Sequence, residues 1–109
     1  MNTLLVLTNL PDRACAEKIA DVLVSRRLAA CVNILPPCRS IYRWKGVVES
    51  ADEVPLFIKT TVSAYPALEA ALRAAHPYET PEIVAIPVER GLPEYLDWVA
   101  AETRSDAAP

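Results

Sequence analysis

The segment Val54–Thr61 (VPLFIKTT) decides the fold of this chain. β-Branched and aromatic residues are frequent in it, so it predicts a β-strand. Because side chains alternate along a strand, every second residue from Val54 points toward the expected helices, while Phe57 and Lys59 point to the other face. Pro55 lacks a backbone donor, which predicts an edge segment or a bulge near the start of this strand.

The elements around this strand follow the order βαββαβ with one more helix at the end. Strands are expected at 4–7, 28–35, 54–61 and 83–88, a hairpin at 39–49, and helices that end near residues 26, 75 and 103. This order predicts an α+β, ferredoxin-like split βαβ fold, in which two helices cover one face of an antiparallel sheet. At 109 residues we expect one domain over 1–104 and a disordered tail at 105–109.

The predicted strands are apolar on both faces, although an antiparallel sheet with one wet face should alternate apolar and polar residues. Leu4 and Val6 point one way, and Leu5 and Leu7 point the other way. The segment 83–86 repeats this pattern. Leaving the second face in water would expose a larger apolar patch than monomers usually tolerate. We therefore expect self-association, and the pattern does not specify the number of copies.

Composition excludes several classes of protein. A net charge of −3 and a pI near 5.1 disfavour nucleic acid as a partner. No apolar run is long enough for a membrane span, and the basic start of a signal peptide is missing, so a cytoplasmic protein is expected. Its three cysteines form no C-x-x-C pair, which favours reduced thiols over a disulfide framework or a zinc finger.

Chemistry-bearing residues fall in three places: the hairpin segment 42–46, Glu53 with Lys59, and the loop His76–Glu82, which two prolines stiffen. A lysine at position 59 on the apolar second face is costly unless a carboxylate pairs with it, and Glu53, Glu79 and Glu82 are the available partners. Two interpretations stay open. Lys59 forms an ion pair within an oligomer interface, or it belongs to a pocket for an anionic or polar ligand.

The other candidates also have two interpretations each. Trp44 is either an anchor in a neighbouring subunit or a stacking platform for a planar ligand, and Tyr42 and Tyr78 can line the same cleft. Cys31 lies within an apolar strand, which favours a buried thiol over a metal ligand. The only histidine, His76, is either a helix cap or a metal ligand.

Four motifs in this order resemble the CutA divalent-cation tolerance proteins. They are Leu28-Ala29-Ala30-Cys31-Val32-Asn33-Ile34, Tyr42-x-Trp44-x-Gly46, Glu53 with Lys59-Thr60, and His76-Pro77-Tyr78-x-Thr80-Pro81-Glu82. The resemblance implies a ferredoxin-like homotrimer similar to the PII signalling proteins, with no catalytic activity. It also implies clefts between subunits, lined by residues matching Cys31, Tyr42, Trp44, Glu53, Lys59, Tyr78, Thr80 and Glu82.

One departure from the family pattern concerns copper. Some bacterial members associated with copper carry a cysteine at the end of the first strand and a His-His pair before Pro-Tyr. This chain has Thr8 at the first position and Ala75-His76 at the second. Only His76 remains of that set, so we expect weak or indirect metal binding rather than a high-affinity copper site.

The expected function is therefore that of a cytoplasmic, homotrimeric, non-catalytic protein of divalent-cation tolerance. It requires no cofactor, and copper or another divalent metal is its expected ligand, with His76 the metal-binding candidate. The alternative is a PII-like sensor of a small anionic or planar ligand in the intersubunit cleft. An enzyme with a Lys59–Glu53 acid/base pair is less favoured, because the residue sets of familiar catalytic sites are incomplete. A structural scaffold also remains compatible with the sequence.

Overall fold

Five strands and three helices make up residues 2–103, the part of the chain that this computed structural model describes. The strands are β1 (Thr3–Leu10), β2 (Cys31–Ile34), β3 (Cys38–Trp44), β4 (Val47–Thr61) and β5 (Val84–Pro87). The helices are α1 (Arg13–Ser25), α2 (Tyr65–Ala75) and α3 (Pro93–Glu102). All strand pairs are antiparallel, in the order β2-β4-β1-β5, with β3 paired to the first half of β4. The α+β, ferredoxin-like prediction is confirmed, and the tail at 105–109 lies outside the described residues.

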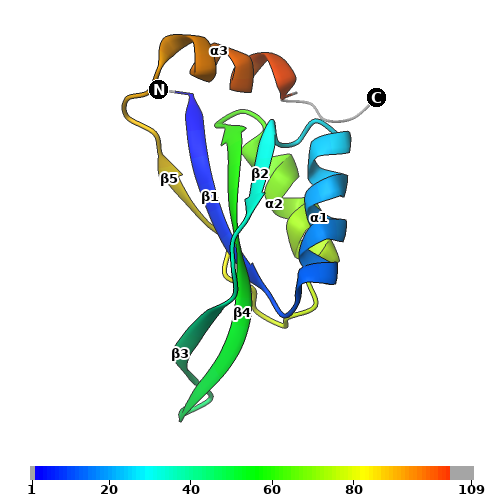
Figure 1. Cartoon of the computed structure of the whole chain (residues 1–109), viewed down its shortest axis with the longest axis vertical. Helices are drawn as coiled ribbons and strands as arrows, with labels where there is room; N and C mark the ends of the chain where they lie inside the picture. Colours follow the sequence, from blue (N-terminus) through cyan, green and yellow to red (C-terminus); the bar gives the residue numbers. More distant parts are fainter. Residues whose placement is uncertain (1, 104–109) are drawn as a thin grey trace.

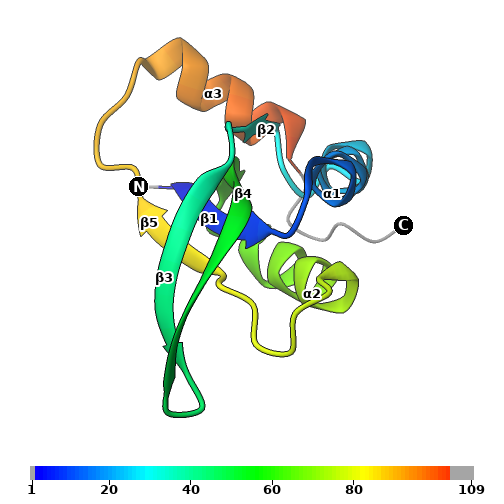
Figure 2. The ribbon, with the colours of Figure 1, turned by 60° about the horizontal axis from the view of Figure 1, so that its bottom comes forward.

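The hydrophobic core lies between the sheet and two of the helices. Figures 1 and 2 show α1 and α2 side by side on the same face of the sheet. Side chains less than 5% exposed fill the space between these layers: Val6, Leu10, Ile19, Leu23, Val54, Leu56, Ile58, Leu68 and Leu72. The alternation along 54–61 therefore places every second side chain in the core, as the sequence predicts.

The connection from α1 to β2 is a turn rather than the beginning of the strand. Asp12 caps the start of α1 by accepting a hydrogen bond from the Cys15 N–H at 2.8 Å. At its other end, Arg27 adopts a left-handed φ of 61°, and the N–H of Leu28 donates to the carbonyl of Leu23 at 2.9 Å. The strand expected at 28–35 is therefore shorter, because the residues before Cys31 complete the helix end instead.

The hairpin and the third predicted strand are one continuous element. β4 runs for 15 residues, and it pairs first with β3 and then with β2. Lys45 and Gly46 form the turn, both with positive φ. Pro55 lies in the middle of β4, not near its start, and its carbonyl accepts from the N–H of Leu35. Its missing donor thus falls where β4 changes partner, at the end of β2.

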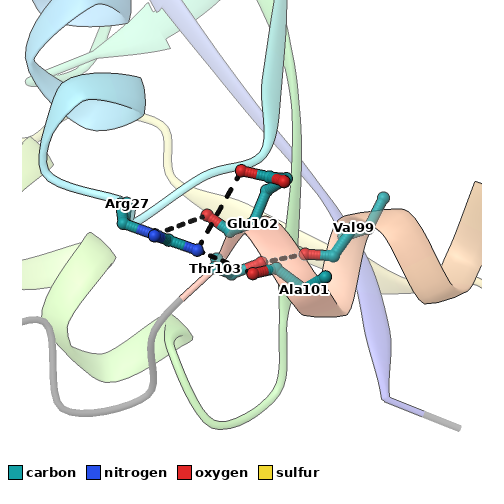
Figure 3. Close-up of polar contacts among 5 residues, drawn as sticks. All are labelled: Arg27, Val99, Ala101, Glu102 and Thr103. Atoms are coloured by element: carbon teal, nitrogen blue, oxygen red, sulfur yellow. Dashed lines mark hydrogen bonds and ion pairs between the residues drawn. The ribbon is translucent and has the colours of Figure 1, made fainter.

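The C-terminal helix is attached at one end of the sheet (Figure 1). The fully buried side chain of Val99 anchors it there. Figure 3 shows the guanidinium of Arg27 at the end of α3, where it donates to the carbonyls of Ala101 (2.7 Å) and Glu102 (3.3 Å). A cation that satisfies the free carbonyls of a helix end is favourable. Arg27 therefore connects the end of α1 to the end of α3.

The second face of the sheet keeps large apolar side chains accessible. β1 places Leu5 and Leu7 there, opposite Ile86 and Val84 of β5. Phe57 is 37% exposed, Val84 45% and Ile86 46%. The expectation of an apolar second face is confirmed for the single subunit, and α3 covers only one end of it.

Truncating a side chain on the helix-covered face should destabilise the fold strongly. Leu56→Ala removes a fully buried side chain and leaves a cavity, so we expect the free energy of unfolding to fall by about 2–5 kcal/mol. Urea denaturation at constant protein concentration measures it. The control, Val24→Ala on the outer side of α1, should change stability by less than about 0.5 kcal/mol. Equal effects of the two variants would contradict this assignment of the core.

Candidate functional site

The eight predicted cleft residues do not converge on one point in a single subunit. β4 carries both Glu53 and Lys59, and six residues of extended strand separate their Cα atoms by about 20 Å. One set, named here the hairpin group, comprises Tyr42, Glu53 and Tyr78. The other, named the lysine group, comprises Cys31, Asn33, Lys59 and Tyr95. A Lys59–Glu53 acid/base pair within one subunit is excluded by this separation.

The hairpin group joins β3, β4 and the loop after α2. Burial, followed by hydrogen bonding to the Glu53 carboxylate, raises the pKa of Tyr78 well above its ordinary value. Burial and the carboxylates of Glu49 and Glu53 also raise the pKa of Tyr42. Both phenols therefore keep their protons at neutral pH and act as donors to acidic neighbours. The carboxylate of Glu53 is engaged within its own subunit.

The tip of the hairpin is connected to the same loop. Lys45 Nζ lies 3.8 Å from Glu79 Oε1 and 5.5 Å from the centre of the Trp44 ring. Both charged side chains of this pair are more than 70% exposed, so its contribution to stability is small. Trp44 itself is 36% exposed. Lys45 thus covers part of the Trp44 ring, which the sequence analysis interprets as an anchor or a stacking platform.

The remaining loop residues have separate surroundings. Glu82 Oε1 accepts a hydrogen bond from Asn9 Nδ2 at 2.9 Å, which connects the loop to the end of β1. Thr80 is exposed, and it contacts neither group through a side-chain hydrogen bond among the described residues. Within one subunit, Glu79 and Glu82 are thus partners of other side chains rather than of Lys59.

Lys59 has different neighbours from those expected. Its Nζ donates to Asn33 Oδ1 and lies 3.9 Å from Cys31 Sγ, since Cys31 stands directly opposite it on β2. Among residues 2–103, no carboxylate oxygen lies within 4.0 Å of this ammonium. Within one subunit the three glutamates expected as partners contact other side chains instead, and an ion pair across an oligomer interface stays a prediction.

His76 is the C-cap residue of α2, as one of its two interpretations predicts: its N–H donates to the Leu72 carbonyl at 2.9 Å, and its side chain is buried. Only 7% of it is exposed, and its Nε2 lies 2.9 Å from the Asn9 carbonyl and 3.2 Å from Thr8 Oγ1. Its Nδ1 accepts from the N–H of Tyr78 at 3.3 Å. A neutral ring protonated on Nε2 satisfies both contacts. Burial lowers the pKa of His76, and the Asn9 carbonyl and Glu53 oppose this effect.

The described residues offer a metal ion one nitrogen ligand, that of His76, but not the several ligands that a resident metal needs. No group of three or more His, Cys, Asp or Glu side chains in 2–103 is placed to hold a metal ion. The Nε2–H contact with a backbone carbonyl is the arrangement that orients metal-binding histidines. Nδ1, however, already accepts a hydrogen bond, so coordination there requires the loss of that bond.

Sequence reasoning missed Asn33 and Tyr95, which complete the lysine group, and Asn9, which contacts Glu82 and His76. Asn33 shares strand parity with Cys31, and this pattern could have suggested a contact with Lys59. Tyr95 comes from α3 and follows Lys59 by more than 30 residues. No local pattern indicates that it meets Cys31.

Comparison with known proteins assigns this arrangement to a family. Residues 4–102 match the CutA1 divalent ion tolerance protein family. The chain belongs to the CutA family. It is 50% identical over 98 residues to the divalent-cation tolerance protein CutA of Thermus thermophilus, covering 90% of this chain and 95% of that one. It is also 50% identical to protein CutA of Mus musculus, over 87% of this chain and 54% of that longer one.

Solved CutA structures share the fold. The crystal structure of CutA from Xylella fastidiosa aligns with a TM-score of 0.92 at 44% identity, over 95% of this chain and 100% of that chain. The divalent cation tolerance protein from Thermus thermophilus aligns with a TM-score of 0.92 at 48% identity, over 94% and 99% of the two chains. The resemblance inferred from the four motifs is therefore confirmed, and CutA is not a known enzyme family.

The buried histidine of this CutA protein should make its stability depend on pH. Because burial lowers the folded-state pKa below the ordinary 6.5, the unfolded chain takes up a proton more readily. The free energy of unfolding should therefore fall as the pH drops from 7 to about 5. His76 is the only histidine, so His76→Gln should flatten this dependence. Urea midpoints at several pH values measure it, and identical pH slopes for both proteins would contradict the assignment.

Proposed function

We propose that this chain forms a homotrimer that acts in divalent-cation tolerance as a non-catalytic binding protein, with its ligand in the clefts between subunits. The supporting observation is the apolar second face of the sheet, where Phe57, Val84 and Ile86 stay accessible in one subunit. Covering these side chains with other copies would contribute roughly 1.5–3 kcal/mol for each one fully buried, before the costs of association. Three copies rather than two are proposed from the resemblance to the trimeric CutA and PII architecture.

The separation of the two site groups supports a composite cleft. About 20 Å of β4 lies between the hairpin group and the lysine group of one subunit. The hairpin extends away from the body of the subunit (Figures 1 and 2), so it is free to reach a neighbour. In the proposed trimer, the hairpin group of one subunit and the lysine group of the next would line a shared cleft.

Metal binding in this proposal is weak and involves His76. The ring is oriented through its Nε2 contact, and a divalent ion such as Cu²⁺ would use Nδ1 after displacing the Tyr78 N–H. One nitrogen is a small ligand set, so no resident metal is proposed. This agrees with the loss of the cysteine and of the second histidine found in some copper-associated members.

A second candidate function is sensing of a small anionic or planar ligand, as in PII-like proteins. The observation that favours it is the ammonium of Lys59, which has no carboxylate within 4.0 Å among the described residues. We also propose a cytoplasmic location, because Cys15, Cys31 and Cys38 are all free thiols. The solved relative from Archaeoglobus fulgidus is named a periplasmic protein. No helix within residues 2–103 is long and apolar enough to cross a membrane.

Light scattering tests the proposed assembly. At micromolar concentration, with and without Cu²⁺, the protein should show about three times the subunit mass of 11.9 kDa. Phe57→Asp places a charge on the second face and should shift the mass toward one subunit. Val24→Asp, on the outer side of α1, should leave the mass unchanged. A stable single subunit for the unmodified chain would refute the trimer.

Copper titration tests the role of His76. The Cys38→Ser variant removes an exposed thiol that would otherwise react with Cu²⁺, and it serves as the reference. Adding His76→Ala should weaken Cu²⁺ affinity clearly, because it removes the proposed nitrogen ligand. Isothermal titration calorimetry measures this, with circular dichroism to confirm that the double variant is folded. Equal affinity of the two folded variants would remove His76 from the proposal.

A further inference from the structure

We infer that Lys59, Asn33 and Tyr95 form a receptor for one small oxyanion, a carboxylate or a phosphate group. These residues belong to the lysine group and come from three elements, β4, β2 and α3. The inference builds on the proposed ligand-binding cleft and states the chemistry of its ligand. It involves no metal ion.

The ammonium of Lys59 has no counter-charge within 4.0 Å in its own subunit, among the described residues. Lys59 is partly buried on the apolar second face, beside Leu5, its partner residue on β1. A partly buried ammonium is costly without a counter-anion. The expected partners are engaged elsewhere: Glu79 with Lys45, and Glu82 with Asn9. Within the described chain the ammonium meets only an amide oxygen and a thiol, so an anion from outside would supply the missing charge.

Asn33 supplies an amide donor beside the ammonium. Asn33 Oδ1 accepts from Lys59 Nζ, and the Cys31 thiol lies 3.9 Å from the same oxygen. With the oxygen used in this way, the Nδ2 of Asn33 remains as a donor. This amide nitrogen donates to no other acceptor among the described residues. The lysine group thus offers an ammonium and an amide donor on one side of the sheet.

The third donor is the hydroxyl of Tyr95. Burial, followed by interaction with Cys31, raises the pKa of Tyr95, so the hydroxyl keeps its proton at neutral pH. In the receptor this hydroxyl would turn its one proton from Cys31 to the bound oxyanion, and Tyr95 as a whole is 39% exposed. Two neutral donors and one cation, with no carboxylate of the same described subunit within 4.0 Å of Lys59 Nζ, favour an oxyanion and disfavour a divalent cation.

The position of Tyr95 depends on a contact at the far end of α3. Arg27 donates to the carbonyls of Ala101 and Glu102, and its guanidinium also lies 4.0 Å from the Glu102 carboxylate (Figure 3). Thr103 turns its hydroxyl back to the carbonyl of Val99 in the same last turn. Arg27 is therefore a positioning residue: it holds the helix that brings Tyr95 to Cys31.

Titration of the full chain with sodium phosphate and with sodium acetate, at constant ionic strength, tests the receptor. Calorimetry should detect saturable binding of at least one of the two anions. Lys59→Met should weaken it by tenfold or more, because a hydrogen bond to a charged group is lost. Lys18→Met removes an exposed lysine of α1, on the helix-covered side of the sheet, and should leave affinity unchanged. Lys59→Arg keeps the charge and should retain binding, which separates loss of charge from misfolding.

Two further variants test the other donors. Tyr95→Phe should weaken anion binding severalfold while leaving the fold intact, because only a hydroxyl is removed. Arg27→Gln should lower affinity by a similar factor although it lies at the opposite end of α3. Its effect should disappear in the Tyr95→Phe background, since a positioning residue acts only through the residue that it positions. An additive effect of the two changes would refute the positioning role of Arg27.

The outcomes separate the receptor from the trimer. Binding of phosphate alone or of acetate alone supports the receptor and identifies which group it prefers. Binding that persists in Lys59→Met refutes it. In another outcome the unmodified chain forms a trimer that binds neither anion, while Lys59→Met lowers the mass seen by light scattering. A carboxylate of the neighbouring subunit then neutralises the lysine. This outcome refutes the receptor and supports the trimer. A single subunit that binds anions supports the receptor and refutes the trimer.

Discussion

The alternation of side chains along β4 is the constraint on which the rest of the structure depends. Even-numbered residues from Val54 to Ile58 fill the core under α1 and α2, so odd-numbered residues must occupy the second face. Phe57 and Lys59 therefore share a surface that the helices do not cover. The same physical rule that builds the core also places the candidate chemistry on the opposite side, where other subunits or ligands can reach it.

Polar contacts between distant segments give that surface its local order. His76 connects the loop after α2 to the end of β1, and Asn9 extends this connection to Glu82. Arg27 does the same for α3 at the opposite end of the sheet. Only the His76 contact with Thr8 is buried, and there an unpaired polar group would be costly. The loop after α2 and the helix α3 are thus anchored separately, and the strands that carry Glu53 and Lys59 lie between them.

Divalent-cation tolerance, the function in the family name, does not require that the protein hold a metal tightly. Here the one histidine is hydrogen-bonded within the fold, and Lys59 on the second face contacts Asn33. Under the function proposed above, metal tolerance would follow from a response to a small ligand rather than from sequestration of the ion.

Much of the fold follows from local pattern. The apolar alternation at 54–61 predicts the face that each side chain occupies, and helical spacing predicts α1 and α2, because these periods are imposed by backbone geometry alone. The motifs around Cys31, Trp44 and His76 also indicate the family correctly. Element boundaries were less accurate. The strand expected from Leu28 begins at Cys31, because a left-handed Arg27 closes the helix with those residues.

Fold class, family and the apolar character of both sheet faces all follow from the sequence alone. Which polar groups meet follows from the tertiary arrangement: Lys59 with Asn33, Tyr95 with Cys31, and His76 with the Asn9 carbonyl. The physical reason is the sequence separation over which each kind of information acts. Periodicity reflects the local geometry of one element. A contact between side chains depends on register, twist and helix placement over tens of residues.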